Sequence, residues 1–287
     1  MINIMDNNII LNRIFTKSTF NEILNNKKSD CYSNVIKTYL ENFENKKNKE
    51  LIKDLYKFMD KKYRNEYYFK NTLINKLLLG KYSLNTTTAL TEVPINKSKA
   101  DFILVNKSKG IVYEIKTGLD TLDRLENQLK DYYKAFTLVN VVISEEKYEK
   151  VNKLLENTNI GIYILTKHNT LSLRKRPIED SSKLEYKTIF NILRKNEFEN
   201  IILDYYKELP KIQAAFYYDK CFELINQIDI NLFYSYMLNQ LKKRIIINKR
   251  DFLEKIPYEL KFLVYFSEYN INDYSNISNF LEKGFEY

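Results

Sequence analysis

The chain has 287 residues, 44% of them hydrophobic and 29% charged, and its 46 Lys and Arg against 37 Asp and Glu give a net charge of +9. This length and apolar content exclude wholesale disorder and suffice for one or two domains with a real core. Two distant cysteines and a single histidine, His168, exclude a disulfide framework and a zinc site and disfavour a Ser–His–Asp triad.

The first 60 residues are predicted to form helices. Apolar residues recur at three- and four-residue spacing in segments that begin near Ile9, Tyr32 and Leu51. A further helix is predicted over residues 61–79, with Gly80 as its C-cap.

A sheet is predicted next. Branched and aromatic residues indicate strands at about 87–93, 101–106 and 111–117, with Gly110 as the turn residue of the hairpin between the last two. A helix follows with Asp120 as its N-cap, or Thr121 as the other candidate, and it ends near Phe136. Its side chains at helical spacing should face the sheet: Leu122, Leu125, Leu129, Tyr132 and Phe136.

Two further apolar strands at 139–144 and 161–166 flank a helix at 145–156, and an edge strand is predicted at 171–174. The helix before residue 139 is long enough for a crossover between parallel strands. The order of elements therefore predicts an α/β fold, a mixed sheet flanked by helices.

The run R-K-R-P at 174–177 is the predicted boundary to an all-helical C-terminal part. The predicted organisation is thus a helical segment at 1–60, an α/β domain at 61–176 and a helical domain at 177–287. The run L-K-K-R ends one of the C-terminal helices, where basic residues favour the helix dipole; a basic track for a nucleic-acid duplex is the functional alternative.

Three charged residues lie at the ends of two predicted strands. Asp101 opens one strand, and Glu114 and Lys116 close the next. Because side chains alternate along a strand, Asp101 and Glu114 converge if the two strands pair. Two adjacent carboxylates favour a cation between them, and oxygen ligands select Mg²⁺ or Mn²⁺. With a lysine to orient a metal-bound water, the arrangement suits phosphodiester hydrolysis.

The pattern E-x-K also has a simpler reading. It occurs four more times in this chain, each time in polar, helix-like surroundings where solvated charge explains it. Only Glu114 and Lys116 close an apolar strand that follows a strand opened by an aspartate.

The strings S-K-A-D-F-I-L-V-N and Y-E-I-K-T-G-L-D-T-L-D-R-L-E-N-Q-L-K-D-Y-Y carry a resemblance. Over residues 60–175 the chain resembles the PD-(D/E)XK, or restriction-endonuclease-like, nucleases, in a stand-alone prokaryotic and phage branch of poorly characterised function. Ala100 stands where that superfamily has a nominal proline, which is not a ligand. The resemblance implies a restriction-endonuclease-like fold and a Mg²⁺- or Mn²⁺-dependent nuclease.

Residue by residue, the resemblance implies that Asp101, Glu114 and the backbone carbonyl of Ile115 bind the metal ion. Lys116 would position the attacking water. On the following helix, Gln128 is the first-choice catalytic helper.

Three further residues have open roles. Arg124 would contact a phosphate, or belong to an ordinary solvated helix face. Some members of the superfamily use another acidic residue, for which Glu66 and Glu92 are the candidates, with Glu66 slightly favoured; a structural salt bridge is the alternative for either.

The leading functional hypothesis is a nuclease that acts on nucleic acid, with DNA favoured over RNA, in a phage-defence or mobile-element context. The positive net charge agrees with such a partner without requiring it. The alternative is a catalytically inactive nuclease-like fold that binds nucleic acid or protein. The presence of all three residues, Asp101, Glu114 and Lys116, argues against that alternative. The chain could also form a homodimer.

The expected location is the cytoplasm. The start M-I-N-I-M-D lacks the basic and apolar regions of a signal peptide, and no apolar run approaches the ~20 residues of a membrane helix.

Overall fold

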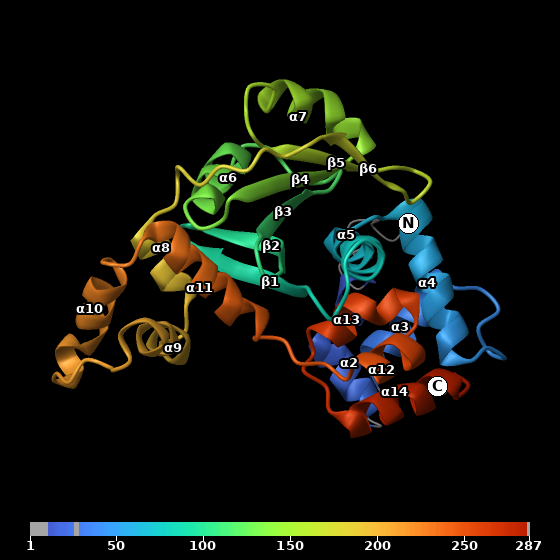
Figure 1. Ribbon diagram of the computed structural model, residues 1–287. Coiled ribbons are helices and arrows are strands. Elements are labelled where there is room, and N and C mark those ends of the chain that lie inside the picture. Colours follow the sequence, from blue (N-terminus) through green and yellow to red (C-terminus); the bar gives the residue numbers. More distant parts are fainter. Residues whose placement is uncertain (1–10, 26–28, 286–287) are drawn as a thin grey trace. The chain divides into compact units, whose positions relative to one another are not determined.

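A computed structural model describes residues 11–25 and 29–285 of the chain. The helix predicted from Ile9 therefore begins outside the described residues. The chain divides into two compact units, one of Met1–Lys81 with Ile246–Tyr287 and one of Tyr82–Ile245. We call them the helical unit and the sheet unit (Figure 1).

The helical unit contains helices from both ends of the chain. The described elements of the helical unit are α2 (Lys17–Leu24), α3 (Asp30–Tyr39), α4 (Asn48–Lys62), α5 (Glu66–Leu73), the π-helix η1 (Ile74–Leu79), α12 (Lys249–Lys255), the short η3 (Tyr258–Leu260), α13 (Lys261–Tyr265) and α14 (Ile271–Glu282).

Among the described helices of both units, none has the length and apolar character that crossing a bilayer requires.

The chain ends are joined by polar contacts as well as by packing. The Asn48 side-chain amide donates to the carbonyl of Phe280 at 3.0 Å, and Lys47 forms a β-bridge with Gly284. Helix α14 packs on α2 and α4. The final helices thus complete a core that the first helices begin, and the sequence patterns indicated neither α12 nor α14.

The helix predicted over residues 61–79 is interrupted. Helix α4 ends at Lys62, and α5 begins at Glu66 because the side chain of Asn65 accepts a hydrogen bond from the Tyr68 amide at 3.0 Å, as an N-cap does. Gly80 is the C-cap of η1, as predicted, although its φ of −91° is not the left-handed conformation common at glycine caps.

The sheet unit is built on six strands that lie in chain order across the sheet. Strands β3, β4 and β5 are parallel, and the other neighbouring pairs are antiparallel. This confirms the predicted mixed α/β class. The strands are β1 (Thr88–Ile95), β2 (Ser98–Val105), β3 (Gly110–Lys116), β4 (Leu138–Ser144), β5 (Gly161–Leu165) and β6 (Leu171–Lys175).

Gly110 is not the turn residue of the β2–β3 hairpin. It has no positive φ and pairs with Val105 as the first residue of β3. The side chain of Asn106 shapes the loop instead, by accepting hydrogen bonds from the amides of Ser108 and Lys109. A Cβ at Gly110 would lie 2.5 Å from the ring of Phe136, so glycine is required here by packing.

The helix after β3 begins later than predicted. Asp120 does not cap it, because its carboxylate turns back to accept hydrogen bonds from the amide and the hydroxyl of Thr117, each at 2.7 Å. Helix α6 starts at Leu125 and ends at Tyr133. The residues between Gly118 and Arg124 form turns rather than a first helical turn.

One face of the sheet carries the core of this unit. Inward-facing residues such as Ile103, Val112 and Val141 form one apolar cluster with buried side chains of the flanking helices. The helices of the unit are α6, the short η2 (Glu145–Lys147), α7 (Tyr148–Leu154), α8 (Tyr186–Ile192), α9 (Lys195–Tyr206), α10 (Ala214–Ile225) and α11 (Ile230–Lys242).

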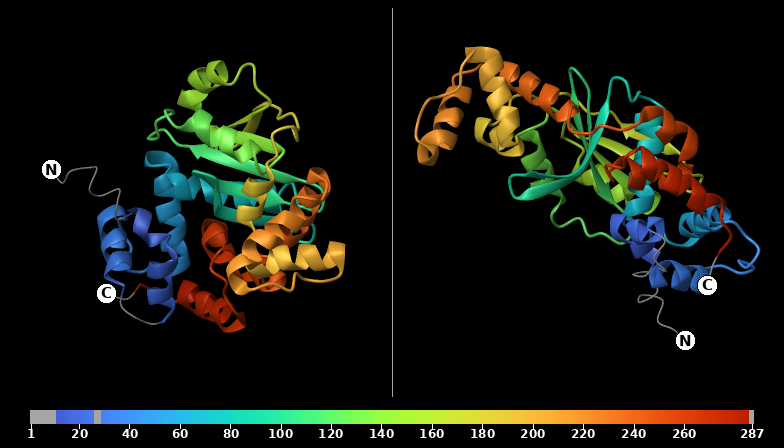
Figure 2. Two further views of the ribbon diagram at one scale, coloured as in Figure 1. Left: turned by 90° about the vertical axis from the view of Figure 1, so that its left-hand side faces the viewer. Right: turned by 90° about the horizontal axis from the view of Figure 1, so that it is seen from below.

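Residues 177–245 belong to the sheet unit. Helix α8 contacts β1, and α11 contacts β1 and β2. Figures 1 and 2 show these helices beside the sheet. The compact units therefore have other boundaries than the predicted segments 1–60, 61–176 and 177–287. After R-K-R-P, α8 and α11 pack on the sheet, and α9 and α10 pack on these helices and on each other, up to Ile245.

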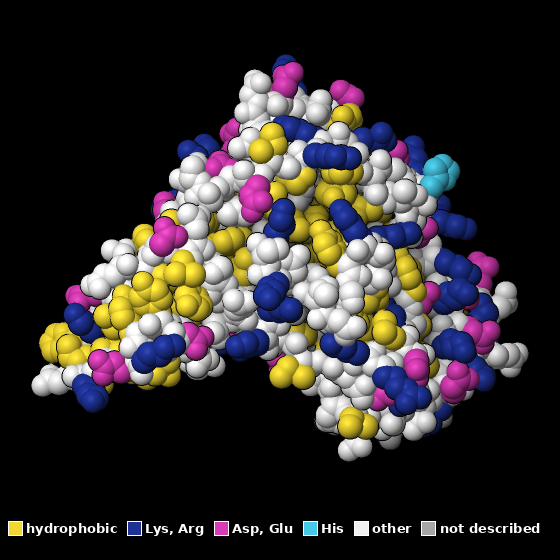
Figure 3. Space-filling view, in the orientation of Figure 1, with side chains coloured by type: hydrophobic (Ala, Val, Ile, Leu, Met, Phe, Trp, Pro, Cys, Tyr) yellow, Lys and Arg dark blue, Asp and Glu magenta, His cyan; other side chains and the backbone are white. Residues whose placement is uncertain are grey.

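The α9–α11 region also leaves large apolar side chains exposed. They appear as a yellow area in Figure 3. The most exposed of them is Phe216, at 57%, and the others are Leu203, Tyr205, Ile212, Tyr218 and Leu232. We call this set the α9–α11 apolar surface.

Arg244, the last residue of the run L-K-K-R, has a structural partner. Its guanidinium donates to both carboxylate oxygens of Glu197, at 2.7 and 2.5 Å, and to the carbonyl of Ile192 at 2.7 Å. The side chain of Glu197 is buried and that of Arg244 is mostly buried, at 6% and 11% exposed. This residue therefore holds α8 and α9 in place instead of extending a basic track.

We expect Gly110→Ala to lower the free energy of unfolding by about 1–3 kcal/mol, because the added methyl must displace the buried Phe136 and Leu238 side chains. Urea unfolding followed by circular dichroism measures it. Gly284→Ala is the control, since a Cβ there meets nothing within 4 Å. Equal stability of Gly110→Ala and the native chain would contradict the packing role.

We expect Glu197→Gln to destabilise the chain by about 3 kcal/mol at pH 7, because it leaves Arg244 buried without its counter-charge. Burial by itself raises the pKa of Glu197, but the hydrogen bonds and charge of Arg244 outweigh burial and lower it below 4.5. A lowered folded-state pKa stabilises above the unfolded pKa, and this contribution disappears as the pH falls through the folded pKa.

The difference in unfolding free energy between Glu197→Gln and the native chain should therefore shrink below about pH 4.5. Glu254→Gln, which breaks the exposed pair with Arg250, serves as the control and should change stability by less than about 1 kcal/mol. A difference that stays constant down to pH 3 would show that Glu197 is not held as a carboxylate by Arg244.

Candidate active site

Strands β2 and β3 bring two of the predicted acidic residues together, although β2 begins at Ser98, so Asp101 lies within it and does not open it as predicted. Phe102 pairs with Tyr113, so the next residues along the two strands, Asp101 and Glu114, are opposite each other. One carboxylate oxygen of Asp101 accepts a hydrogen bond from the backbone amide of Ile115 at 2.7 Å. Asp101 is half-buried, whereas Glu114 lies inside the protein.

The carboxylate of Glu114 is only 1% exposed and has a partner at each oxygen. Its Oε1 is 2.7 Å from the ammonium of Lys116, and its Oε2 accepts a hydrogen bond of 2.5 Å from the hydroxyl of Tyr132. A buried carboxylate without such partners would be strongly unfavourable. The two contacts therefore allow a charged group at the end of a buried strand.

Lys116 connects the strand to the helix behind it. Its ammonium donates to Glu114 and also to the side-chain carbonyl of Gln128 on α6, at 2.9 Å. Residues 12 positions apart in the chain thereby meet at one point. The structure thus brings together Glu114, Lys116 and Gln128, with Asp101 opposite Glu114.

Tyr132 is a residue of this cluster that sequence reasoning assigned only to the core. Burial, together with the adjacent carboxylate of Glu114, raises the pKa of Tyr132 far above its usual value. Its hydroxyl therefore keeps its proton and donates. The available signal was its spacing, since Tyr132 lies four residues after Gln128 and hence on the same helix face.

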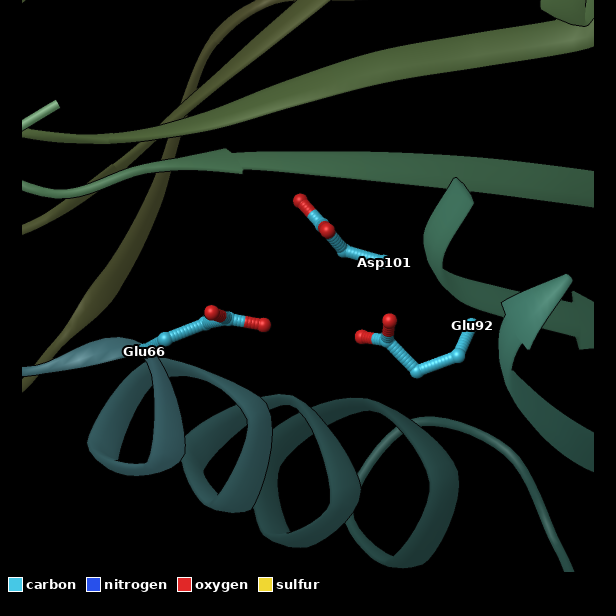
Figure 4. A group of neighbouring side chains, drawn as sticks. All are labelled: Glu66, Glu92 and Asp101. Carbon is cyan, nitrogen blue, oxygen red and sulfur yellow. The ribbon is translucent and has the colours of Figure 1, made fainter. Parts of the chain in front are cut away.

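Glu92 is the acidic residue that β1 contributes. The pairs Thr91–Phe102 and Val93–Ala100 flank it, so it lies across from Asp101, and one oxygen of each carboxylate lies within 4.8 Å of the other (Figure 4). Its φ of 55° is in the left-handed region, which costs energy for a residue with a side chain.

Two further predicted residues come from helices instead of strands. Glu66, which Figure 4 also labels, is the first residue of α5 in the helical unit, where it forms an ion pair with Lys70 at 2.5 Å. Arg124 occupies the N-cap position of α6 with its side chain exposed, and it forms no ion pair within the part of the chain that the structure describes.

The donor set suits a hard divalent cation. Asp101 and Glu92 offer carboxylate oxygens within 4.8 Å of each other, and Glu114, opposite Asp101, offers a third carboxylate. Glu92 also forms an ion pair with Lys99. Each carboxylate oxygen has two lone pairs, so an oxygen that accepts a hydrogen bond can still coordinate a cation. Histidine and cysteine, which zinc prefers, are absent from this group.

Comparison with known proteins gives a family but no solved structure. The model of the family described as bacteriophage P4 protein cII matches residues 59–263, well over half of the chain. A curated relative, "Protein cII" of Enterobacteria phage P4, is 24% identical over 189 residues, which cover 62% of this chain and 67% of the relative. No solved structure matches. The chain belongs to the bacteriophage P4 protein cII family.

Proposed function

We propose that this chain is a Mg²⁺- or Mn²⁺-dependent nuclease of the restriction-endonuclease-like type that hydrolyses phosphodiester bonds in the cytoplasm. The observation that supports it best is the meeting of Glu114, Lys116 and Gln128 opposite Asp101, where β3 ends. Four polar side chains from two strands and a helix converge there, on a sheet face that is otherwise apolar.

The cation would be held by Asp101, Glu114 and the carbonyl of Ile115. When bound, it supplies a water of lowered pKa and stabilises the negative charge that grows on the phosphate. Glu92 is the added acidic ligand with the stronger support in the sheet unit, because its carboxylate lies within 4.8 Å of Asp101. Glu66 stays a second candidate for that role.

Lys116 is suited to orient the attacking water. An ammonium has three N–H donors, and Glu114 and Gln128 accept two of them. The third is left for a water or a phosphate oxygen, since Lys116 has no other partner among the described residues. Gln128 and Glu114 thus fix the direction in which the remaining donor points.

DNA is the substrate we favour, with RNA as the alternative. The net charge of +9 favours a polyanion, and Lys and Arg side chains are spread over the surface in Figure 3. The exposed Arg124 precedes α6 beside the cluster and would contact a phosphate. A relative from a bacteriophage supports a mobile-element context.

We expect Lys116→Ala and Asp101→Asn each to reduce cleavage of plasmid, single-stranded DNA or RNA in Mg²⁺ or Mn²⁺ by about 10²-fold or more, because each removes a group that acts on the water or the metal. Lys187→Ala is the matched control, since Glu185 and Lys187 form the same E-x-K pattern in an exposed position at the start of α8. Circular dichroism checks that the variants fold.

Cleavage that persists undiminished in both variants would exclude this site. A native chain that binds nucleic acid in a salt-dependent manner, takes up no metal and never cleaves would instead identify a binding module. Metal uptake is measured by Mn²⁺ titration with paramagnetic resonance.

We expect Tyr132→Phe to reduce cleavage by about tenfold or more while the chain stays folded, because it removes the hydrogen bond to the charged Glu114 without changing the packing of the ring. The apparent Mn²⁺ affinity should fall with it. Tyr148→Phe on α7 is the control, as this side chain only packs partly buried against the core. Native Mn²⁺ affinity and cleavage in Tyr132→Phe would show that Tyr132 merely fills space.

A further inference from the structure

Helix α10 is more apolar than its place in the fold requires. Nine of its twelve residues are apolar, yet within the described helix Cys221 and Ile225 alone are buried. The helix packs on α8 and α9, and Figure 1 shows it at the outer edge of the sheet unit. A helix that is apolar on most sides is normally enclosed by other elements. The described part of the sheet unit instead leaves much of the apolar surface of α10 in contact with solvent.

The exposed apolar residues continue into the loop before α10. Residues 211–216 are all exposed, and they include Ile212, Ala214, Ala215 and Phe216. Runs of about three or more exposed apolar residues are avoided on a surface that meets only water. Because Ile212 and Phe216 belong to the α9–α11 apolar surface, that surface extends over the loop and the start of α10.

The α9–α11 apolar surface has the area that a stable protein–protein contact needs. Its six large side chains are 39% to 57% exposed. With a full surface on the order of 200 Å² for each side chain, they expose about 500 Å² together. A standard interface buries about 800 Å² on each partner, of which roughly 60%, or about 500 Å², is apolar. The exposed area therefore matches the apolar part of one side of such an interface.

The charges around this surface nearly balance. The segment 194–232 runs from the N-cap of α9 to Leu232 and carries five basic residues and six carboxylates besides Glu197, which Arg244 neutralises. The whole chain, by contrast, has a net charge of +9. Two copies of the chain therefore repel each other less at this surface than elsewhere, and a nucleic acid gains little here.

Basic and acidic residues also alternate along this segment. Lys207 is followed by Glu208, and Asp219 is followed by Lys220. In a contact with two-fold symmetry, the same surface of both copies meets. A surface that carries both signs can place lysines opposite carboxylates in such a contact, whereas a surface of one sign would repel its own copy.

We propose that the α9–α11 apolar surface is the contact between two copies of this chain related by two-fold symmetry. Phe216, the most exposed of its side chains, and Ile212 pack against the same surface of the second copy. None of the residues proposed for metal binding or catalysis belongs to this surface, so the inference does not rest on nuclease activity. Association ends at two chains, because each copy uses its one surface in the contact.

Sedimentation equilibrium of the full chain, freed of nucleic acid by chromatography, measures the association over about 1 to 100 µM. We expect an equilibrium between monomer and dimer. Phe216→Ser should weaken the dimer by about tenfold or more, and Ile212→Ser by about threefold or more, because each substitution removes apolar surface from both copies at once.

Ile178→Ser is the matched control for Ile212→Ser. Ile178 is also an exposed isoleucine of the sheet unit, but it follows β6 and lies outside the α9–α11 apolar surface. Its substitution should leave the dimer unchanged. All three side chains are exposed, so none of the substitutions opens the core, and circular dichroism checks that the variants fold.

Salt separates an apolar contact from one held by charge. Because salt screens the repulsion between two chains of net charge +9, the dimer should be as tight or tighter at high salt than at low salt. A dimer that dissociates as salt is raised would overturn the proposal, as would a dimer that Phe216→Ser leaves unchanged or one that Ile178→Ser and Ile212→Ser weaken equally. A native chain that stays monomeric would assign the surface to a different partner and overturn the proposal as well.

Discussion

The burial of one carboxylate, that of Glu114, constrains the rest of the sheet unit. Moving such a charge out of water costs on the order of several kcal/mol, which only close and well-aligned partners can offset. Lys116 from the same strand and Tyr132 from α6 are those partners. The crossover helix must therefore lie over the end of β3, and Gln128 is brought to Lys116 by the same placement.

Such an arrangement is hard to explain by stability alone, because well-packed apolar residues often replace a buried ion pair without loss of stability. Elsewhere on this sheet face the buried side chains are apolar, as expected where residues serve packing alone. The proposed chemical role would explain why the charges are kept, and the carboxylate oxygens of Asp101, Glu114 and Glu92 would suit a divalent cation in that role. The family match identifies relatives of the chain, whereas the functional proposal rests on the arrangement of Asp101, Glu114, Lys116 and Gln128.

Local sequence patterns predicted helices and strands well where the structure of a segment depends mainly on its own residues. The six strands and the parallel crossover follow from alternation, apolar runs and helix spacing, and each is found close to its predicted place. Predictions about the roles of single residues failed where a contact with another residue sets the role. Gly110 is needed because Phe136 lies against it, and Asp120 turns back to Thr117 instead of capping α6.

Sequence alone determined that Asp101, Glu114 and Lys116 lie on two neighbouring strands with their side chains on one face, because alternation along strands joined by a short loop leaves few other registers. Only the tertiary structure decided that α6 adds Gln128 and Tyr132 to that group, and that Arg244 holds α8 and α9 together within the sheet unit. These contacts join residues 12 to 52 positions apart. Their geometry depends on how whole elements pack, which no local periodicity encodes.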